Sequence, residues 1–391
     1  MKAMILAAGR GTRVRPLTYA FPKPMIPIGH KPVMELLVEH LARHGFDQIM
    51  VNTSYLSPVI EGYFRDGGRF GVEMAYSFEG HLSEEGLVDA PVGSAGALRQ
   101  IHDHSGFFDQ TFVVLCGDAI IDLDLTQLVA QHRRQGALAT IAVKRVPQER
   151  VASYGVVVTD PAGRVRSFQE KPSPAEARST LANTGIYVFE PEILDAIPAG
   201  RTYDIGGELF PRLVEADAPV YAAELPFQWL DIGQTPDYYD VMQMALQGQV
   251  HNVTLPGTPL AEGLHVGLNV QLDPTATMIV PPVYIGGSAV VQPGSTIVGP
   301  AFIGPGCIIE SGAHVERSIV FEYTRVGPGA YLAETLVCGG YCVSRNGAVI
   351  DLARADIGWV VTDARRPAAD PAPVQMQIQE ALRELGRAVP A

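Results

Sequence analysis

The chain has 391 residues, of which 47% are apolar and 18% charged, and this composition predicts a well-buried protein of two or three domains. Its formal net charge of −13 argues against a nucleic-acid partner, because phosphate backbones recruit basic surfaces. The four cysteines form no CxxC pair, and no signal peptide or long apolar run is visible, so we expect a cytoplasmic protein without a membrane partner.

Apolar strand-like runs alternate with helix-like segments over residues 1–246. Residues 2–7 have the pattern of a buried first strand, and residues 33–44 have helical spacing between Pro32 and Gly45. Further strands are expected at 49–52, 112–115, 139–144, 156–159 and 186–189, and further helices at 123–135 and 236–246. This alternation predicts an α/β, Rossmann-like first domain, a mixed sheet with helices on both faces.

The pattern changes after residue 263, where aliphatic residues recur at every sixth position. The recurring residues are Ile279, Ile285, Val291, Ile297, Ile303, Ile309 and Val315. A six-residue period lets each aliphatic point inward from one side of a triangular coil. We therefore predict a left-handed parallel β-helix over 263–345, a linker over 247–262, and a C-terminal tail over 346–391. Within that tail, Gln375–Arg387 has the spacing of one short amphipathic helix.

A glycine-rich stretch, Gly9-Arg10-Gly11, directly follows the first predicted strand. Glycines there let backbone N–H groups approach a triphosphate closely, and Arg13 adds a fixed guanidinium fork. The stretch is not a dinucleotide fingerprint, because Val14 stands where the third glycine belongs, and no Gly-Lys-Ser/Thr follows as in a P-loop. Further on, Pro22 and Pro24 frame Lys23 in a rigid loop.

The run from Gly9 to Pro24 resembles the signature GxGTRxRPLT…PKP of the sugar nucleotidyltransferases that make NDP-sugars. The later motifs of that family follow in order, namely Gly93-Ser94-Ala95-Gly96, Gly117-Asp118, Phe168-Gln169-Glu170-Lys171-Pro172, Asn183-Thr184-Gly185-Ile186-Tyr187 and Trp229-Leu230-Asp231-Ile232-Gly233. The whole chain is similar, more closely, to the cyanobacterial type of UDP-glucose pyrophosphorylase, a group built like the mannose-1-phosphate guanylyltransferases. The resemblance implies that residues 1–246 are a nucleotidyltransferase catalytic domain.

The resemblance also implies a role for each motif. Arg13 and Lys23 would grip the triphosphate and steady the leaving pyrophosphate, and Asp118 and Asp231 would hold Mg²⁺. The implied nucleotide-binding residues are Ala7, Ala8, Gly9, Gly11, Thr12, Gly93, Ser94 and Gly96, and the implied sugar-phosphate-binding residues are Tyr154, Gly155, Glu170, Lys171 and Asn183. Taken alone, an aspartate at a strand end is more often a cap than a metal ligand.

The implied reaction is UTP plus α-D-glucose 1-phosphate giving UDP-glucose and pyrophosphate, by in-line attack on the α-phosphate. Two alternatives stay open: a mannose-1-phosphate guanylyltransferase using GTP, and a catalytically silent subunit that only binds NDP-sugars. Ser94 stands where the family often has threonine or glutamine, which leaves the base preference undecided. The coil is expected to serve assembly, so we also predict a homo-oligomer, a dimer or tetramer.

Overall fold

The computed structural model describes residues 1–84 and 86–367, and the chain divides into two compact units. The first unit comprises Met1–Gly11, Phe21–Ile26 and Pro32–Asp231. The second comprises Thr12–Ala20, Pro27–Lys31 and the residues from Ile232 onward. Among the described residues, no helix is long and apolar enough to cross a membrane.

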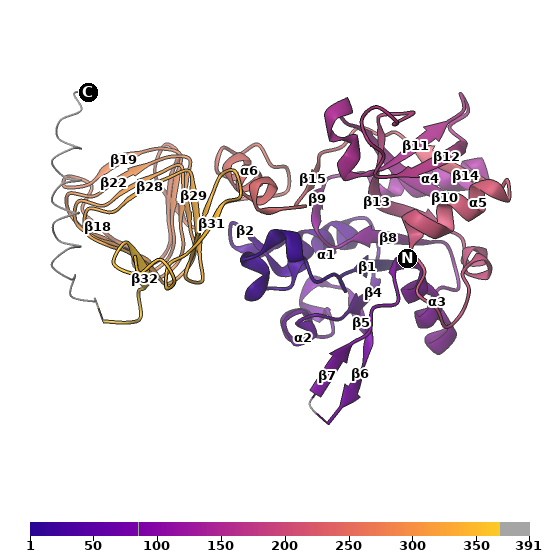
Figure 1. Ribbon diagram of the computed structural model, residues 1–391, viewed down its shortest axis with the longest axis horizontal. Helices are drawn as coiled ribbons and strands as arrows, with labels where there is room; N and C mark the ends of the chain where they lie inside the picture. Colours follow the sequence, from indigo (N-terminus) through magenta and orange to yellow (C-terminus); the bar gives the residue numbers. More distant parts are fainter. Residues whose placement is uncertain (85, 368–391) are drawn as a thin grey trace. The chain divides into compact units, whose positions relative to one another are not determined.

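A mixed sheet forms the centre of the first unit (Figure 1). Its strands run in the order β12-β11-β13-β8-β1-β4-β5, and β10 adds to β13 and β14. β1 is parallel to both of its neighbours, whereas β13 is antiparallel to β8, as a mixed sheet requires. The bounds are β1 (Lys2–Leu6), β4 (Gln48–Thr53), β5 (Glu73–Phe78), β8 (Phe112–Cys116), β10 (Ala139–Arg145), β11 (Gly155–Thr159), β12 (Val165–Glu170), β13 (Leu181–Phe189) and β14 (Val220–Ala223).

Helices cover both faces of this sheet, which confirms the predicted fold class. Successive residues of β1 point to opposite faces, so Ile5 and Met4 belong to two different hydrophobic cores. The core around Ile5 includes residues of α1 and α2, and the core around Met4 includes residues of α3 and α5. The helices of this unit are α1 (Val33–Arg43), α2 (Ser57–Phe64), α3 (Ser94–Ser105), α4 (Leu125–Gln135) and α5 (Phe210–Glu215).

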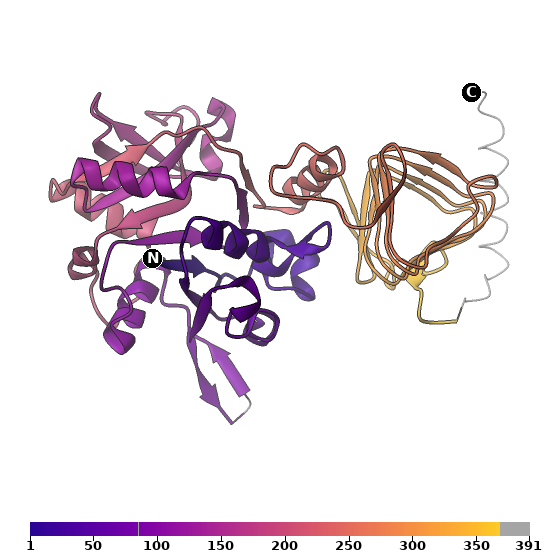
Figure 2. The ribbon, with the colours of Figure 1, turned by 180° about the vertical axis from the view of Figure 1, so that it is seen from behind.

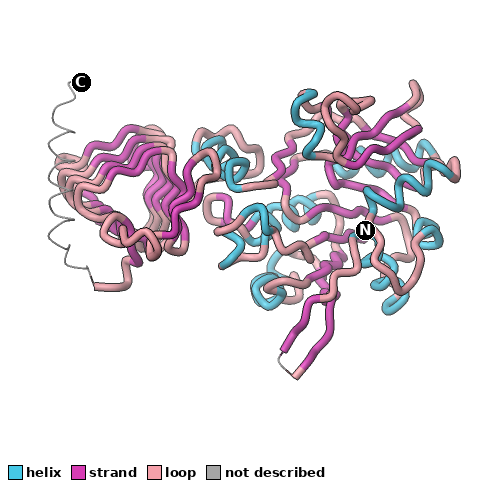
Figure 3. The backbone as a smooth tube through the Cα atoms, in the orientation of Figure 1, coloured by secondary structure: helices cyan, strands magenta, loops and turns pink. Residues whose placement is uncertain are grey.

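A two-stranded hairpin extends from the end of β5 (Figure 3). It consists of β6 (Gly80–Ser83) and β7 (Gly86–Asp89), which pair antiparallel. The acidic run 79–89 has the composition of a mobile solvated loop, whereas its described residues form this hairpin, most of whose side chains are at least partly exposed. Glu79, at the base of the hairpin, is only 3% exposed.

The second unit contains α6 (Thr235–Leu246) and a coil whose strands stack in three sheets over residues 258–363 (Figure 2). The sheets run in the orders β16-β17-β20-β23-β26-β29-β30-β31, β18-β21-β24-β27-β32 and β19-β22-β25-β28. Their bounds are β16 (Thr258–Ala261), β17 (Leu264–Val266), β18 (Gln271–Leu272), β19 (Met278–Val280), β20 (Val283–Ile285), β21 (Val290–Val291), β22 (Thr296–Val298), β23 (Ala301–Ile303), β24 (Ile308–Ile309), β25 (His314–Glu316), β26 (Ile319–Val320), β27 (Thr324–Val326), β28 (Tyr331–Ala333), β29 (Thr335–Cys338), β30 (Tyr341–Ser344), β31 (Val349–Asp351) and β32 (Val361–Asp363).

The six-residue period of the sequence is the side length of this parallel β-helix. Ile279 pairs in register with Ile297, and Ile297 with Val315, so equivalent residues in successive turns are 18 positions apart. On another side, Ile303 pairs with Val320 although these two residues are 17 positions apart rather than 18. Counted between paired residues, the chain takes one residue fewer from Glu316 to Ile319 than from Val298 to Phe302, their partners in the preceding turn. This shorter connection explains why the sequence period slips near Phe321.

The coil changes direction at its C-terminal end. β29, β30 and β31 pair antiparallel, and β32 pairs antiparallel with β27. The last strand that pairs in parallel on this side is therefore β29, which lies inside the predicted coil. The antiparallel strands after it extend into the start of the predicted tail. The helix expected at Gln375–Arg387 lies outside the described residues.

Candidate active site

Two aspartates that are far apart in the sequence lie together beside the carboxyl end of the central sheet. Asp118 follows β8 through Gly117, whose N–H donates to the Leu6 carbonyl at 2.9 Å. A Cβ at Gly117 would lie 2.8 Å from that carbonyl oxygen, so glycine is required for β1 and this turn to approach. Asp231 ends β15 (Trp229–Asp231), which pairs antiparallel with β9 (Ala119–Ile121). In that register Asp231 lies opposite Ala119, directly beside Asp118.

Lys23 reaches this pair of carboxylates from a separate loop. It begins the 3-10 turn Lys23–Met25, and the prolines on both sides restrict its backbone. Its ammonium group donates to Asp118 Oδ2, and only 11% of the lysine side chain is exposed. Because the pair is largely shielded from water, the positive charge of Lys23 acts directly on the site.

The predicted sugar-phosphate residues lie on or beside three neighbouring strands, β12, β11 and β13. Lys171 follows β12, and its ammonium group contacts Glu170 Oε1 at 2.8 Å. The backbone of Lys171 has a φ of +45°, a conformation that L-residues adopt at a cost and that concentrates at functional sites. Its N–H donates to the Tyr154 carbonyl at 3.2 Å, which fixes the turn. The Tyr154 ring in turn packs against Trp229, with the ring centroids 4.9 Å apart.

Asn183 is held by its own strand. Its amide donates to the Tyr187 hydroxyl at 3.0 Å, and its Oδ1 accepts from the Gly185 N–H at 3.0 Å. Burial raises the pKa of Tyr187 well above its ordinary value, so this hydroxyl stays protonated. The nearby Cys116 thiol also has its pKa raised by burial and by Asp118 and Asp231, which excludes it as a thiolate nucleophile.

One cavity of about 260 Å³ brings most of these residues together. The predicted site residues that line it are Ser94, Asp118, Tyr154, Gly155, Glu170, Lys171, Asn183 and Asp231. Ala7, Ala8 and Gly9 follow β1, outside this lining, although Gly117 links the end of β1 to Asp118. Thr12 and Arg13 belong to the second unit, in the 3-10 turn Thr12–Val14, so their contact with a triphosphate stays a prediction.

The segment Gly93–Gly96 forms the N-terminus of α3 and packs against a second loop. The N–H groups of Ala95 and Gly96 both donate to the Tyr203 carbonyl, each at 2.9 Å. A Cβ at Gly93 would lie 2.5 Å from that same oxygen, and the backbone there has a φ of +78°. Glycine at this position is therefore needed for the packing of the two loops, whatever contact it makes with a base.

Three polar residues of the site region were missed by sequence reasoning. Asp204 accepts a hydrogen bond from the Ser94 hydroxyl at 2.7 Å, and it lines the same cavity. Asn52 accepts from the Ala7 N–H at 2.8 Å, and Glu79 contacts Asn52 from the base of the hairpin. None of the three stands in a recognisable motif, and their partners are chosen by how the strands are ordered in the sheet.

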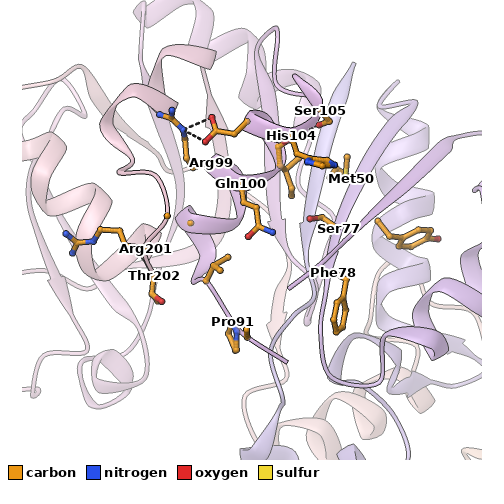
Figure 4. Close-up of a pocket in the computed structure, with 17 residues that line it drawn as sticks. Met50, Ser77, Phe78, Pro91, Arg99, Gln100, His104, Ser105, Arg201 and Thr202 are labelled. Atoms are coloured by element: carbon orange, nitrogen blue, oxygen red, sulfur yellow. Dashed lines mark hydrogen bonds and ion pairs between the residues drawn. The ribbon is translucent and has the colours of Figure 1, made fainter. Parts of the chain in front are cut away.

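A larger cavity of about 950 Å³ lies along α3 and β5 (Figure 4). Its charged side chains have partners in the chain: Arg99 holds Asp103 at 2.8 Å, and Arg201 contacts Glu208 at 3.5 Å. Figure 4 shows Gln100, Ser77 and Phe78 facing the central space, and Gly96 also contributes to the wall. This cavity contains neither aspartate and neither lysine of the predicted site, so the smaller cavity is the better candidate for the chemistry.

A divalent cation fits the donor set at Asp118 and Asp231. Within the described ranges, no group of three or more His, Cys, Asp or Glu side chains is placed to hold a metal. Two carboxylates whose remaining positions are filled by water and phosphate oxygens are a usual arrangement for Mg²⁺. The ammonium of Lys23 on Asp118 is a further sign that this position favours a cation.

Comparison with known proteins gives a consistent result. A family model described as "Nucleotidyl transferase" matches residues 2–248. The chain is 54% identical over 368 residues to a UTP--glucose-1-phosphate uridylyltransferase of Synechocystis sp., covering 94% of this chain and 95% of that protein. It is 33% identical to mannose-1-phosphate guanylyltransferase 1 of Arabidopsis thaliana, over 86% of each chain. Among solved structures, a putative glucose-1-phosphate thymidylyltransferase from Bacillus anthracis has the same fold, with a TM-score of 0.53 and 24% identity over 62% of this chain and 94% of that chain.

Proposed function

Because this chain belongs to the nucleotidyl transferase family, we propose that it joins UTP to α-D-glucose 1-phosphate, forming UDP-glucose and releasing pyrophosphate. The observation that carries the proposal is the 54% identity to the Synechocystis uridylyltransferase over 94% of the chain. The cavity that combines Asp118, Asp231 and Lys171 supports the same reaction class, since it offers cation-binding and phosphate-binding groups side by side.

The reaction needs little proton transfer, because the sugar phosphate is already anionic at neutral pH. One of its oxygens attacks the α-phosphorus of UTP, and the bond from that phosphorus to the bridging oxygen of the pyrophosphate breaks. Catalysis then consists of positioning and of neutralising crowded negative charge. Lys171 would hold the sugar phosphate, and Lys23 and Arg13 would bind the β- and γ-phosphates.

We infer that Asp118 and Asp231 hold Mg²⁺, which when bound neutralises phosphate charge and orients the α-phosphate. Lys23 contacts Asp118 in the protein described here, so the lysine can neutralise either the carboxylate or an incoming phosphate. Glu170 would accept hydrogen bonds from the sugar hydroxyls. Asn183, whose side chain is bonded to Tyr187 and Gly185, would bond to the same hydroxyls.

Two other functions compete with this proposal. The guanylyltransferase similarity, at 33% identity, favours GTP with mannose 1-phosphate as the second candidate. A silent NDP-sugar-binding subunit is disfavoured by the intact contact between Lys23 and Asp118, since a chain without catalysis has no need to keep it.

A panel of nucleoside triphosphates against sugar 1-phosphates, read by pyrophosphate release, tests the three candidates. We expect UTP with glucose 1-phosphate to give the highest kcat/KM. A tenfold or greater preference for GTP with mannose 1-phosphate, about 1.4 kcal/mol, would overturn the assignment. Absence of release with every pair, in protein that still binds UDP-glucose, would favour the silent subunit.

We further propose that the protein is a cytoplasmic homo-oligomer, a dimer or tetramer, in which the coil contributes to the contact. The sheet formed by β19, β22, β25 and β28 carries two strongly exposed apolar side chains, Met278 at 63% and Tyr331 at 61%. Covering these side chains with a second copy of the chain would remove apolar area from water, which is favourable. Light scattering should give more than one chain at micromolar concentration. Met278→Glu should lower the mass, whereas Leu268→Glu, at another exposed coil position, should not. A monomeric wild-type protein would contradict the proposal.

A further inference from the structure

Two buried polar side chains form a continuous hydrogen-bond chain beside the candidate site. The Ala7 N–H donates to Asn52 Oδ1 at 2.8 Å, and Asn52 Nδ2 donates to Glu79 Oε1 at 2.5 Å. The other carboxylate oxygen, Glu79 Oε2, accepts from the Val92 N–H at 3.0 Å. Asn52 and Glu79 are each only 3% exposed.

This series of hydrogen bonds crosses the carboxyl ends of three adjacent parallel strands. Asn52 lies in β4 opposite Leu6 of β1 and Ser77 of β5, and Glu79 directly follows β5. At one end of this series of bonds is Ala7, the first residue of the glycine-rich loop that follows β1 (here called the phosphate loop). The other end is the residue before Gly93, where the predicted base-binding segment begins.

The main chain of Glu79 is fixed as well. Its N–H donates to the Thr53 carbonyl at 2.7 Å, and its own carbonyl accepts from Ala90 at 3.0 Å. The Ser54 hydroxyl donates to the same carbonyl at 3.4 Å. The backbone of Glu79 is thus held in place, and each oxygen of its carboxylate accepts one hydrogen bond.

A buried carboxylate is costly to fold around, and an apolar pair of similar volume would serve stability as well or better. Burial raises the pKa of Glu79, while the bonds from Asn52 and Val92 act in the opposite direction and favour its charged form. A hydrogen-bonded link between two loops has directional bonds, so it fixes the distance between the loops more closely than an apolar contact does. Function can retain such a link despite its cost in stability.

We propose that Asn52 and Glu79 are positioning residues for the nucleotide, which hold the phosphate loop and the Gly93–Gly96 segment at a fixed separation. The proposal rests on the proposed function, and it assigns the triphosphate to the loop after β1 and the base to Gly93–Gly96, since both segments hold predicted nucleotide-binding residues. A nucleotide that must contact both segments is bound well only when their spacing is correct, whereas the residues proposed for the sugar phosphate lie on or beside β11, β12 and β13.

The direction of the hydrogen bonds provides the test. Asn52→Asp still accepts from Ala7 but turns a carboxylate oxygen toward Glu79, so the link is broken by repulsion. In Glu79→Gln the amide oxygen can accept from only one of the two donors, Asn52 or the Val92 N–H. The amide nitrogen then faces the other donor, and that hydrogen bond is lost. In the double variant, the new amide nitrogen at position 79 can donate to the new carboxylate at position 52, while the amide oxygen at position 79 accepts from the Val92 N–H. All three hydrogen bonds are then restored, and the negative charge has moved from position 79 to position 52.

The measurements are the Kd for UTP by calorimetry without sugar phosphate, the KM for both substrates, and the melting temperature. We expect Asn52→Asp to raise the Kd and the KM for UTP about tenfold or more, and Glu79→Gln about threefold to tenfold, as for broken buried polar pairs. The KM for glucose 1-phosphate should stay within about twofold, and the double variant should return UTP binding to within about threefold of wild type. The matched control is Gln48→Glu with Glu73→Gln, an exposed pair at 3.4 Å on the same two strands, which should leave UTP binding unchanged.

Three results would overturn the positioning role. The first is unchanged UTP binding in both single variants. The second is a well-folded double variant that does not recover, and the third is an equal rise in KM for both substrates. If Asn52→Asp does not fold, Glu79→Gln and the double variant carry the same comparison. Absence of pyrophosphate release by the wild type would count against the proposed function alone, because UTP binding is measured without turnover.

Discussion

The coil and the candidate site are built by contacts of different range. In the coil, Ile285, Ile303 and Val320 stack in register from one turn to the next, and each is buried because of its place in a short repeat. In the first unit, the site cavity combines Asp118, Lys171 and Asp231, which come from separate strands and meet through the sheet. Local periodicity therefore determines the coil, and strand order determines the site.

The two regions also differ in what they bury. The core of the coil is a column of aliphatic residues with small ones and cysteines between them. The buried polar residues of the coil carry hydroxyl groups only (Thr277, Ser295, Ser318 and Thr324), whereas the first unit also buries Glu35, His40, Asn52 and Glu79. Buried polar groups need partners at defined positions. Among the described residues, the buried carboxylate, imidazole and amide side chains all lie in the first unit, where the order of the strands must place their partners.

The largest effect that this comparison predicts is the loss of activity at the paired aspartates. Asp118→Asn and Asp231→Asn each remove one charge from the cation site, and we expect turnover to fall by about 10²-fold or more, as for other preorganised charge stabilisers. The melting temperature should change little. Asp109→Asn is the control, since Asp109 pairs with Lys2 at the opposite end of β1 and should leave turnover unchanged. Near-normal turnover in either folded site variant would contradict the metal assignment.

The sequence predicts the coil well because a six-residue repeat of aliphatic residues shows which side chains point into its core. Even the slip near Phe321 is visible in the sequence, although only the structure shows that the connection there is one residue shorter. In the first unit the sequence predicts β1, α1, β4, β8, α4, β10, β11 and the end of β13, but not α2, α3, α5 or the strands β5, β12 and β14. It does not show that residues 12–20, which include Arg13, pack with the second unit.

The site could be predicted only in part. Lys23, Asp118, Lys171 and Asp231 stand in motifs whose resemblance to a family assigns them roles. Asn52, Glu79 and Asp204 stand in no motif, and each acquires its role from a partner on another strand or loop. Composition alone places Glu79 in a solvated acidic run, because it does not reveal that β4 and the Val92 backbone bury its carboxylate.

A smaller effect separates the two lysines of the site. Lys171 lies beside Glu170, in the part of the cavity where we propose that the sugar phosphate binds, and Lys23 contacts Asp118. We expect Lys171→Ala to raise the KM for glucose 1-phosphate about tenfold with little change for UTP, as for loss of one charged phosphate contact. Lys23→Ala should act mainly on the KM for UTP and on turnover. Initial rates with each substrate varied in turn measure the difference. An effect of Lys171→Ala on UTP alone would show that the cavity is divided differently.

The smallest expected effect on activity is that of a coil core variant, and it is the sharpest test of the comparison. Ile303 is fully buried between Ile285 and Val320, so Ile303→Ala should cost about 2–4 kcal/mol of stability through lost burial and the cavity left behind. Turnover of the folded protein should stay within about twofold of wild type, because the stacked turns satisfy their own core and supply none of the cavity residues identified here. Leu268→Ala is the control, since that side chain is 86% exposed and its loss should change neither property. Denaturant unfolding and kcat on the same samples decide the matter. A large fall in kcat without loss of stability would mean that the coil takes part in catalysis, and the division of labour between the two regions would then be wrong.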